Sequence, residues 1–390
     1  MKKWTREEPE QMTALVALKS SKDPFWEVED SLKELERLAV SAGAKSYAQF
    51  IQEKETPSAA TYIGRGKAEE IGKHCFEKNI SLVVFDDELT PAQQRNLEEL
   101  IPSKVIDRTQ LILDIFAQRA RTREGKLQVE LAQLTYLFPR LVGKGKVLSR
   151  LGGGIGTRGP GETRLEVDRR RIRQKISKIK ACLKGVRKTR KLHRTGRRKR
   201  GYPVLALVGY TNSGKSTLMN QLTSAEVMVA NQLFSTLDPT FRQIVLPSGR
   251  EALLVDTVGF IQKIPHSLIA AFMATLEEVC EADLLLHVID SSHPEIDRQC
   301  RAVRQTLKEL EVTEKPLISI YNKVDQVANG KTYRRLVTRE RDAVAISALI
   351  GEGIEELKTL IAEHLSMHAL DQTKVTSFNY EHNQSSAFGF

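Results

Sequence analysis

The chain has 390 residues, 41% of them hydrophobic and 28% charged, so it is long enough to build more than one hydrophobic core. No apolar run reaches the length of about 18 residues that a membrane helix needs, and the first residues lack the apolar stretch of a secretory signal. The four cysteines form no C-x-x-C pair, so we interpret them as reduced thiols of a cytoplasmic protein and not as disulfides or metal ligands: Cys75, Cys182, Cys280 and Cys300.

The net charge of +11 is unevenly distributed along the chain. Residues 143–200 hold 22 Lys and Arg against 3 acids, so this segment carries +19 and the remainder carries −8. A dense surplus of one sign repels itself unless a polyanion neutralises it. The distribution therefore favours a nucleic-acid partner over a merely solvated helix face.

Residues 1–106 alternate strand-like and helix-like patterns. Thr13–Ser20 and Ser81–Glu88 are apolar runs typical of strands, and Asp30–Ala42 has the apolar spacing of a helix. Thr90 precedes Pro91 as in a helix start, with Gln94 close to the position of a capping-box partner. Alternation of this kind predicts a small parallel α/β domain.

Two features of residues 1–106 resemble ligand sites. Gly64 and Gly66 lie in IGRGK, which resembles a phosphate-binding turn but completes no known motif, so a structural glycine turn is preferred over an additional ATPase site. Asp86 and Asp87 are adjacent and would point to opposite sides of a strand. We interpret this acid pair as a turn at a strand end and not as a metal site.

Residues 107–200 are predicted to form an antiparallel helical hairpin. A first helix over 108–142 has apolar residues at steps of three and four, and Pro139 should kink or end it. A second apolar stripe runs from Leu165 to Val186. The glycine-rich loop between them carries four cations that predict a basic tip, with a plain linker as the alternative: Lys144, Lys146, Arg150 and Arg158.

Residues 201–367 are predicted to form a P-loop nucleotide domain, and residues 368–390 a short tail without periodicity. GYTNSGKS, residues 209–216, follows the buried strand VLALV and matches G-x-x-x-x-G-K-[ST]. Backbone N–H groups of such a turn surround phosphate oxygens at a helix N-terminus. Lys215 should reach the β- and γ-phosphates, and the Ser216 hydroxyl should bind Mg²⁺.

NKVD, residues 322–325, predicts guanine recognition and so distinguishes GTP from ATP. A carboxylate accepts both the N1 and N2 donors of guanine, whereas adenine offers no such pair, so Asp325 selects GTP. Asn322 should brace the loop, and Lys323 should cover the ring face. The SAL segment, residues 347–349, follows another strand and should offer the Ala348 N–H to guanine O6.

Two further segments are predicted to surround the γ-phosphate. In DTVGF, Asp256 should hold Mg²⁺ through a water and the Gly259 N–H should contact the γ-phosphate. In FSTLDPT, either Thr236 or Thr240 could complete Mg²⁺ coordination. The next residue after DTVG is Phe260, where a water-orienting glutamine often stands, so we expect slow hydrolysis that a partner stimulates.

The residues expected to contact the nucleotide come from all five segments. They are Gly209, Tyr210, Thr211, Asn212, Ser213, Gly214, Lys215, Ser216, Phe234, Ser235, Thr236, Leu237, Asp238, Asp256, Thr257, Val258, Gly259, Asn322, Lys323, Val324, Asp325, Ser347, Ala348 and Leu349. Lys215 and Gly259 are expected catalytic residues, together with whichever of Thr236 and Thr240 completes the Mg²⁺ site. GTP or GDP and Mg²⁺ are the expected ligands.

The order of these motifs resembles the HflX family of translational GTPases, and the upstream segments YIGRGKAEEI, FDDELTPAQQRNLE and GGGIGTRGPGETRLEVDRR look like that family's N-terminal region. The resemblance implies a protein that binds the 50S subunit and reaches 23S rRNA with its hairpin loop. It implies that the GTP state splits stalled 70S ribosomes under stress. It also implies Thr236, and not Thr240, as the Mg²⁺ ligand, together with Ser216.

The sequence leaves one alternative function open and disfavours another. A GTP-dependent factor for 50S assembly or RNA remodelling would need the same basic arm and slow GTPase, so it remains the alternative. A switch at a membrane surface is disfavoured because no lipidation motif or amphipathic Phe/Trp helix is present. We expect the protein to act as a monomer in the cytoplasm.

Overall fold

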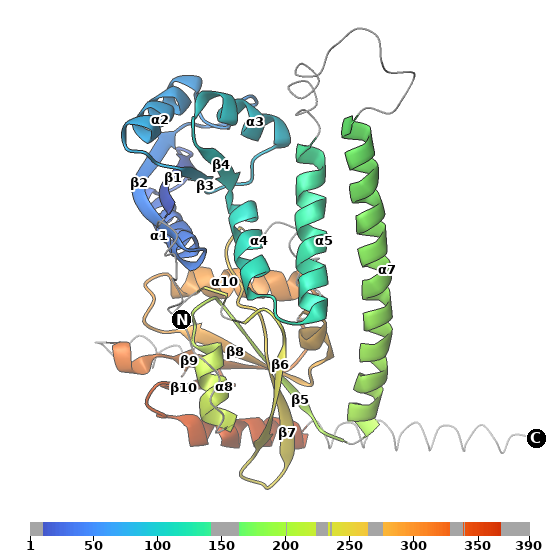
Figure 1. Cartoon of the computed structure of the whole chain (residues 1–390). Helices are drawn as coiled ribbons and strands as arrows, with labels where there is room; N and C mark the ends of the chain where they lie inside the picture. The colour runs from blue at the N-terminus through green and yellow to red at the C-terminus, as the bar shows by residue number, and fades with distance from the viewer. Residues whose placement is uncertain are drawn as a thin grey trace, which may run out of the picture. The chain divides into compact units, whose positions relative to one another are not determined.

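The computed structural model describes residues 11–141, 164–199, 201–223, 233–234, 236–263, 276–327, 338 and 340–367 (Figure 1). The chain divides into two compact units, one of residues 1–189 with 263–273 and the other of residues 190–262 with 274–390. The four cations predicted at the hairpin tip, Ser235 and the tail 368–390 lie outside the described residues. The predicted division at residues 106, 200 and 367 stays a prediction.

The first unit contains a four-stranded parallel sheet in the order β2-β1-β3-β4. Its elements in chain order are β1 Gln11–Lys19, α1 Phe25–Ser41, β2 Ala44–Glu53, α2 Arg65–Glu77, β3 Leu82–Phe85, α3 Pro91–Leu100, β4 Lys104–Asp107, α4 Arg108–Arg119, α5 Arg123–Arg140 and α7 Arg164–Lys199, whose last residues enter the second unit. Apolar strand residues such as Val83 and Phe85 face α2 and α3, where they form a buried core with Ile71 and Leu97. The α/β prediction for this region is confirmed.

Helix α3 begins where the sequence predicted, although its capping partner differs. The Thr90 hydroxyl accepts from the Gln93 N–H at 3.2 Å, and the Gln93 side chain accepts from the Thr90 N–H at 2.9 Å. This reciprocal pair is a capping box, which requires the third helical residue. Gln94 is the fourth, so its amide is directed elsewhere, to the Val105 carbonyl.

The helical segment after the first sheet is two helices and not one. The chain leaves helical geometry at Ala120, and α5 starts again after Thr122, whose hydroxyl accepts from the Gly125 N–H at 2.9 Å. The N-cap at Thr122 therefore interrupts the helix predicted over 108–142. Helix α5 ends one residue after Pro139, in agreement with the expected effect of that proline.

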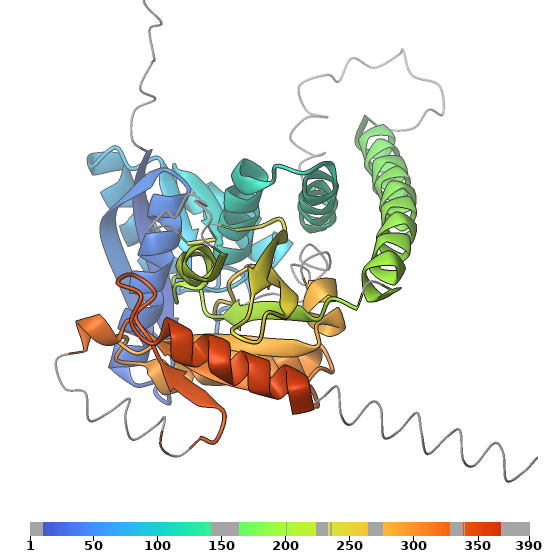
Figure 2. The same ribbon diagram turned by 90° about the horizontal axis from the view of Figure 1, so that it is seen from below.

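Helices α5 and α7 lie beside each other in opposite directions (Figures 1 and 2). Arg169 and Arg173 place their guanidinium groups over the Phe138 ring, and Lys175 pairs with Glu130 at 2.5 Å. The side of α7 opposite these cations is largely solvent-exposed along its described length. The two helices thus form the antiparallel pair that the apolar stripes predicted.

The second unit contains a six-stranded sheet in the order β10-β9-β8-β5-β7-β6, in which β6 runs antiparallel to β7 and the other neighbours are parallel. Its elements are β5 Val204–Gly209, α8 Lys215–Thr223, β6 Thr240–Val245, β7 Glu251–Asp256, β8 Leu284–Asp290, α10 Ile296–Glu309, β9 Leu317–Asn322, the 3-10 turn η1 Val324–Gln326 and β10 Ala343–Ala345, followed by a helix over 354–367. Parallel strands of this kind bring their carboxyl ends to one edge, where ligands bind in open α/β sheets. GYTNSGKS, DTVGF, NKVD and SAL lie at the carboxyl ends of β5, β7, β9 and β10, whereas FSTLDPT leads into the antiparallel β6, which begins at the same edge.

Candidate nucleotide site

The P-loop is a turn that only glycine can form at two positions. Gly209 ends β5 with a φ of 154°, and Gly214 has a φ of 97°. A Cβ on Gly209 would lie 2.3 Å from the Val288 carbonyl oxygen, and one on Gly214 would lie 2.2 Å from Asn322 Nδ2. The backbone therefore approaches β8 and the Asn322 side chain too closely for any other residue. The turn opens toward the N-terminus of α8.

Lys215 is buried at the centre of this turn. Its ammonium donates to the carbonyls of Gly209 at 3.0 Å and Tyr210 at 2.8 Å. Burial lowers the pKa of Lys215 to about 8, although the Asp256 carboxylate acts in the opposite direction. A buried cation held only by carbonyl dipoles and one neighbouring acid is stabilised by an anion such as a phosphate.

Gly259 of the DTVGF segment lies directly against the P-loop. A Cβ at Gly259 would be 2.8 Å from Thr211 Cα and 3.0 Å from Lys215 Nζ. The neighbouring Phe260 donates its N–H to the Gly209 carbonyl at 3.0 Å, and its carbonyl accepts from the Thr211 N–H at 2.7 Å. These two backbone bonds dock the segment on the P-loop, while the Phe260 side chain is buried.

Three oxygen-bearing side chains meet beside Lys215. The Ser216 hydroxyl donates to Asp256 Oδ2 at 2.7 Å, the Thr236 hydroxyl donates to the same oxygen at 2.7 Å, and the two hydroxyl oxygens are 3.1 Å apart. Burial raises the pKa of Asp256, although Lys215 and the two hydroxyls counteract that shift. The structure thus brings together the residues predicted to hold Mg²⁺.

Several polar atoms of this site are buried without a partner among the described residues. They are Asp256 Oδ1, Thr211 Oγ1 and Ser213 Oγ. A buried polar atom without a partner costs about 1–3 kcal/mol, so such atoms are rare unless a ligand completes them. Hard oxygen donors such as these fit a small divalent cation and the oxygens of a phosphate.

Asn322 connects the base-recognition segments to the P-loop. Its Nδ2 donates to the Ser213 carbonyl at 2.8 Å, and its Oδ1 accepts from the Ala348 N–H at 2.9 Å. The Ala348 N–H, expected at guanine O6, is therefore directed to Asn322 in this structure. Ser347 donates its hydroxyl to Asp325 Oδ1 at 2.6 Å and orients that carboxylate.

Asp290 belongs to the site although the sequence analysis did not include it. It ends β8, and its Oδ2 accepts from Lys323 Nζ at 2.6 Å. Lys323 itself has a left-handed backbone with a φ of 65°. The carboxylate therefore holds the lysine side chain that was expected over the base. An acid at the end of the apolar strand LLLHVID was the available signal.

The glycine turn of the first unit does not present a free phosphate cradle. Gly64 precedes α2, and its N–H donates to Gln52 Oε1 at 2.7 Å. A Cβ on Gly64 would lie 3.0 Å from the Gln52 amide nitrogen, whereas one on Gly66 would contact nothing within 4 Å. The N–H that would receive a phosphate is thus already paired. This geometry supports the structural reading of IGRGK.

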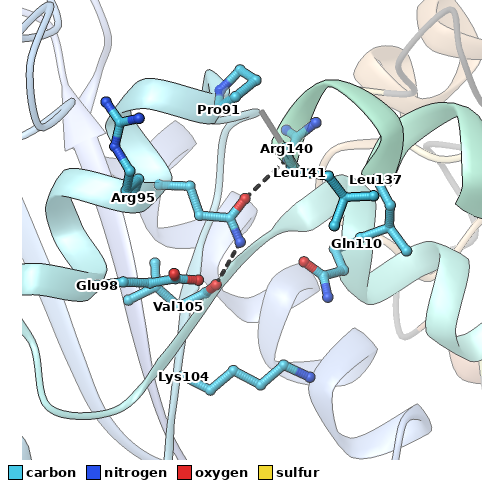
Figure 3. A pocket seen from close by; sticks show the side chains of 10 residues that line it. Pro91, Arg95, Glu98, Lys104, Val105, Gln110, Leu137, Arg140 and Leu141 are labelled. Carbon is cyan, nitrogen blue, oxygen red and sulfur yellow. Dashed lines mark hydrogen bonds between the residues drawn. The ribbon is translucent and has the colours of Figure 1, made fainter. Parts of the chain in front are cut away.

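A hollow of about 230 Å³ lies beside α3, β4, α4 and α5 (Figure 3). Gln94 lines it, accepting from Arg140 Nε at 2.9 Å and donating to the Val105 carbonyl at 2.9 Å. Arg140 also donates to Asp107 at 3.2 Å and stacks 3.4 Å from the Tyr136 ring centroid. These hydrogen bonds pair the polar groups of the hollow with one another. They connect the end of α5 to α3 and to β4.

The part of the chain that the structure describes has neither a group of three His, Cys, Asp or Glu side chains placed to bind a metal ion nor a helix that could span a membrane. No three His, Cys, Asp or Glu residues of the described ranges gather as metal ligands. No described helix combines the length and the apolar character needed to span a bilayer.

The fold and the site define a P-loop GTPase. Three family models match consecutive segments: GTP-binding GTPase N-terminal over residues 29–117, GTP-binding GTPase Middle Region over 119–197, and 50S ribosome-binding GTPase over 204–323. The solved complex of SsGBP with GDP is similar in structure, with a TM-score of 0.50 and 26% identity over 90% of this chain and 98% of that one.

Two curated relatives cover most of the chain. GTPase HflX of Caldanaerobacter subterraneus subsp. tengcongensis is 49% identical over 379 residues, which are 96% of this chain and 85% of that protein. GTPase HflX of Escherichia coli (strain K12) is 46% identical over 348 residues, which are 88% of this chain and 81% of that protein. The chain belongs to the HflX family of GTPases, which hydrolyse GTP, and it carries a ribosome-binding GTPase domain.

Proposed function

We propose that this protein binds the 50S subunit, that its GTP form splits stalled 70S ribosomes under stress, and that hydrolysis to GDP resets it. The observation that carries the proposal is the composition of α7. Residues 169–199 hold 16 Lys and Arg and no acid. A GTPase domain attached to a long cationic helix suits a partner made largely of RNA, and a ribosomal partner implies a cytoplasmic location.

The cationic side of α7 has regular geometry. Ile179 and Leu183 are buried, whereas Lys180, Lys184 and Lys188 are exposed. Residues four apart lie on one side of a helix about 6 Å apart along the axis. These lysines form a row that matches a line of RNA phosphates, and the glycine-rich segment with Lys144, Lys146, Arg150 and Arg158 is proposed to extend the contact to 23S rRNA.

The nucleotide is assigned to the P-loop, with Lys215 on the β- and γ-phosphates and the Gly259 N–H on the γ-phosphate. Asp325 selects guanine by accepting both the N1 and N2 donors, and the Ser347 hydroxyl, which donates to Asp325 Oδ1, orients that carboxylate. Asn322 and Asp290 position the surrounding loops. The remaining P-loop, FSTLD and DTVG residues named from the sequence complete the contacts.

Mg²⁺ is assigned to Ser216 and Thr236, with Asp256 acting through a water. Both hydroxyls approach Asp256 closely, and its Oδ1 has no partner among the residues that the structure describes, which supports this assignment. When bound, the ion neutralises charge that develops on the phosphate oxygens. Because the Phe260 side chain is buried and has no group to orient water, hydrolysis without a partner is proposed to be slow.

GTP hydrolysis with and without 50S and 70S particles, combined with sedimentation of the same mixtures, tests the proposal. We expect stimulation by 50S particles and conversion of 70S to subunits with a non-hydrolysable GTP analogue. Stimulation without conversion would favour the assembly or RNA-remodelling alternative. No stimulation and no sedimentation with either particle would refute a ribosomal partner.

A further inference from the structure

The segment that carries Gly259 belongs to no helix or strand, so its place depends on individual hydrogen bonds. It begins where β7 ends and runs to Gln262. At its start the Thr257 hydroxyl donates to the Leu207 carbonyl at 2.5 Å, and further along Phe260 forms its two backbone bonds with the P-loop. The Gly259 N–H lies between these attachments.

Tyr210 of the P-loop adds a bond in which a side chain is the acceptor. The Gln262 N–H donates to the Tyr210 hydroxyl at 3.0 Å, and the tyrosine is buried. The carbonyl of the same tyrosine accepts from Lys215 Nζ at 2.8 Å. Tyr210 thus contacts the phosphate-binding lysine through its backbone and the Gly259 segment through its side chain. Position 210 is a free position of G-x-x-x-x-G-K-[ST], so the phosphate turn itself does not require a tyrosine.

We propose that the Tyr210 hydroxyl is a positioning group for GTP hydrolysis, and that its bond with the Gln262 N–H keeps the Gly259 N–H at the γ-phosphate position. The proposal rests on the role proposed above for Gly259, and it does not depend on the ribosome. All the residues involved lie in the second unit. A donor that is already in place loses less entropy when it contacts the phosphate. GDP has no γ-phosphate, so the hydroxyl favours GTP over GDP.

A purely structural role for Tyr210 predicts a different result. A ring that only fills the core would support the binding of GDP and of GTP alike. Tyr210→Phe keeps that ring and removes one oxygen, so the Gln262 N–H loses its hydroxyl acceptor and the segment after Gly259 leaves its docked position more often. The phenylalanine variant therefore measures the effect of the hydroxyl and not that of the ring.

The test compares Tyr210→Phe with the unchanged full-length protein, without ribosomes and with Mg²⁺ present. Fluorescence titration measures affinity for GDP and for a non-hydrolysable GTP analogue, and single-turnover assays measure hydrolysis. We expect Tyr210→Phe to lower the ratio of GTP-analogue affinity to GDP affinity about threefold or more, to keep GDP affinity within about twofold, and to slow hydrolysis. Hydrogen exchange should also be faster in peptides that contain Gln262.

Tyr321→Phe is the matched control. Tyr321 lies in β9 of the same unit, is buried, and has its hydroxyl hydrogen-bonded to Glu340. The variant thus makes the same chemical change without touching the bond to Gln262. It should leave both the affinity ratio and the rate of hydrolysis unchanged.

Gly259→Ala separates a failure of this proposal from a failure of the role proposed for Gly259. Its Cβ would lie 2.8 Å from Thr211 Cα, so the segment must move, and the affinity ratio should fall at least as far as in Tyr210→Phe. A fall in Gly259→Ala with no change in Tyr210→Phe would overturn this proposal alone, and no change in either variant would overturn both. An equal loss of affinity for both nucleotides in Tyr210→Phe would also overturn it, because the hydroxyl would then support the whole P-loop.

Discussion

Two glycines with similar positive φ angles allow two costs of a side chain in the P-loop to be measured separately. One cost is backbone strain, and the other is the steric clash of the new Cβ with its neighbours. Gly214 has a φ of 97° and Gly249, in the turn between β6 and β7, has a φ of 75°. A Cβ at Gly249 would contact nothing within 4 Å, whereas one at Gly214 would lie 2.2 Å from Asn322 Nδ2. Alanine at either position pays the strain of a left-handed residue, but only Gly214→Ala must also displace Asn322.

The expected magnitudes follow from the contacts that are lost. Strain at positive φ costs about 1 kcal/mol, and this is the whole cost expected for Gly249→Ala. Displacing Asn322 also breaks its bonds with the Ser213 carbonyl and the Ala348 N–H, both buried, at about 1–2 kcal/mol each. Gly214→Ala should therefore destabilise the nucleotide-free protein by about 3–5 kcal/mol.

The assay is urea unfolding followed by circular dichroism, together with titration of a fluorescent GDP. Because Asn322 joins the P-loop to the SAL segment, Gly214→Ala should weaken GDP binding by about 30-fold or more, whereas Gly249→Ala should leave it within about twofold. Equal stabilities and equal GDP affinities of the two variants would refute the reasoning. They would show that a Cβ at residue 214 does not displace the Asn322 side chain from its hydrogen bonds.

Three further outcomes are expected. Burial lowers the pKa of His287 to about 3, so below about pH 6.5 the unfolded chain binds a proton that the folded protein does not, and the free energy of unfolding should fall. The variant His287→Val lacks this proton site. Its free energy of unfolding, measured by urea titration, should therefore fall by about 2 kcal/mol less between pH 7.5 and pH 5 than that of the unchanged protein. Ser216→Ala should raise the Mg²⁺ concentration that half-saturates GTP-analogue binding by more than about tenfold, and an unchanged value would exclude this hydroxyl as a ligand. Log affinity for 50S particles should fall with log salt concentration, and alanine at Lys180, Lys184 and Lys188 should make that slope less steep by about 2. Alanine at three exposed lysines elsewhere, Lys73, Lys78 and Lys308, should leave the slope unchanged.

The nucleotide face was predictable because its chemistry is local in sequence. The segments that hold Lys215, Asp256 and Asn322 each follow an apolar strand, and parallel strands bring their carboxyl ends together, so these three residues had to meet at one edge. The start of α3 was predictable for a similar reason, since Thr90 and Pro91 determine it within one turn. Short-range patterns carry enough information for such features.

One helix boundary was predicted wrongly, and the partners of one acid pair were not predicted at all. Residues 121–126 hold no proline and no large apolar residue, so the sequence there does not reveal that Thr122 caps a new helix. Asp86 and Asp87 were interpreted as a strand-end turn, which accounts for their place after β3 but not for their partners Arg108 and Lys263. Lys263 lies 177 positions along the chain from Asp86, and nothing in one sequence pairs residues at that distance.

The absence of acids from residues 169–199 also determines how this helix behaves without a partner. Two cations about 6 Å apart in water repel each other by about 0.7 kcal/mol, which is comparable with thermal energy, and most cations of residues 169–199 have at least one other cation three or four positions away. The ribosome-free protein should therefore collect anions from its buffer along α7. Multivalent sulfate or phosphate should raise its melting temperature more than chloride at equal ionic strength, and RNA that binds must first displace those ions.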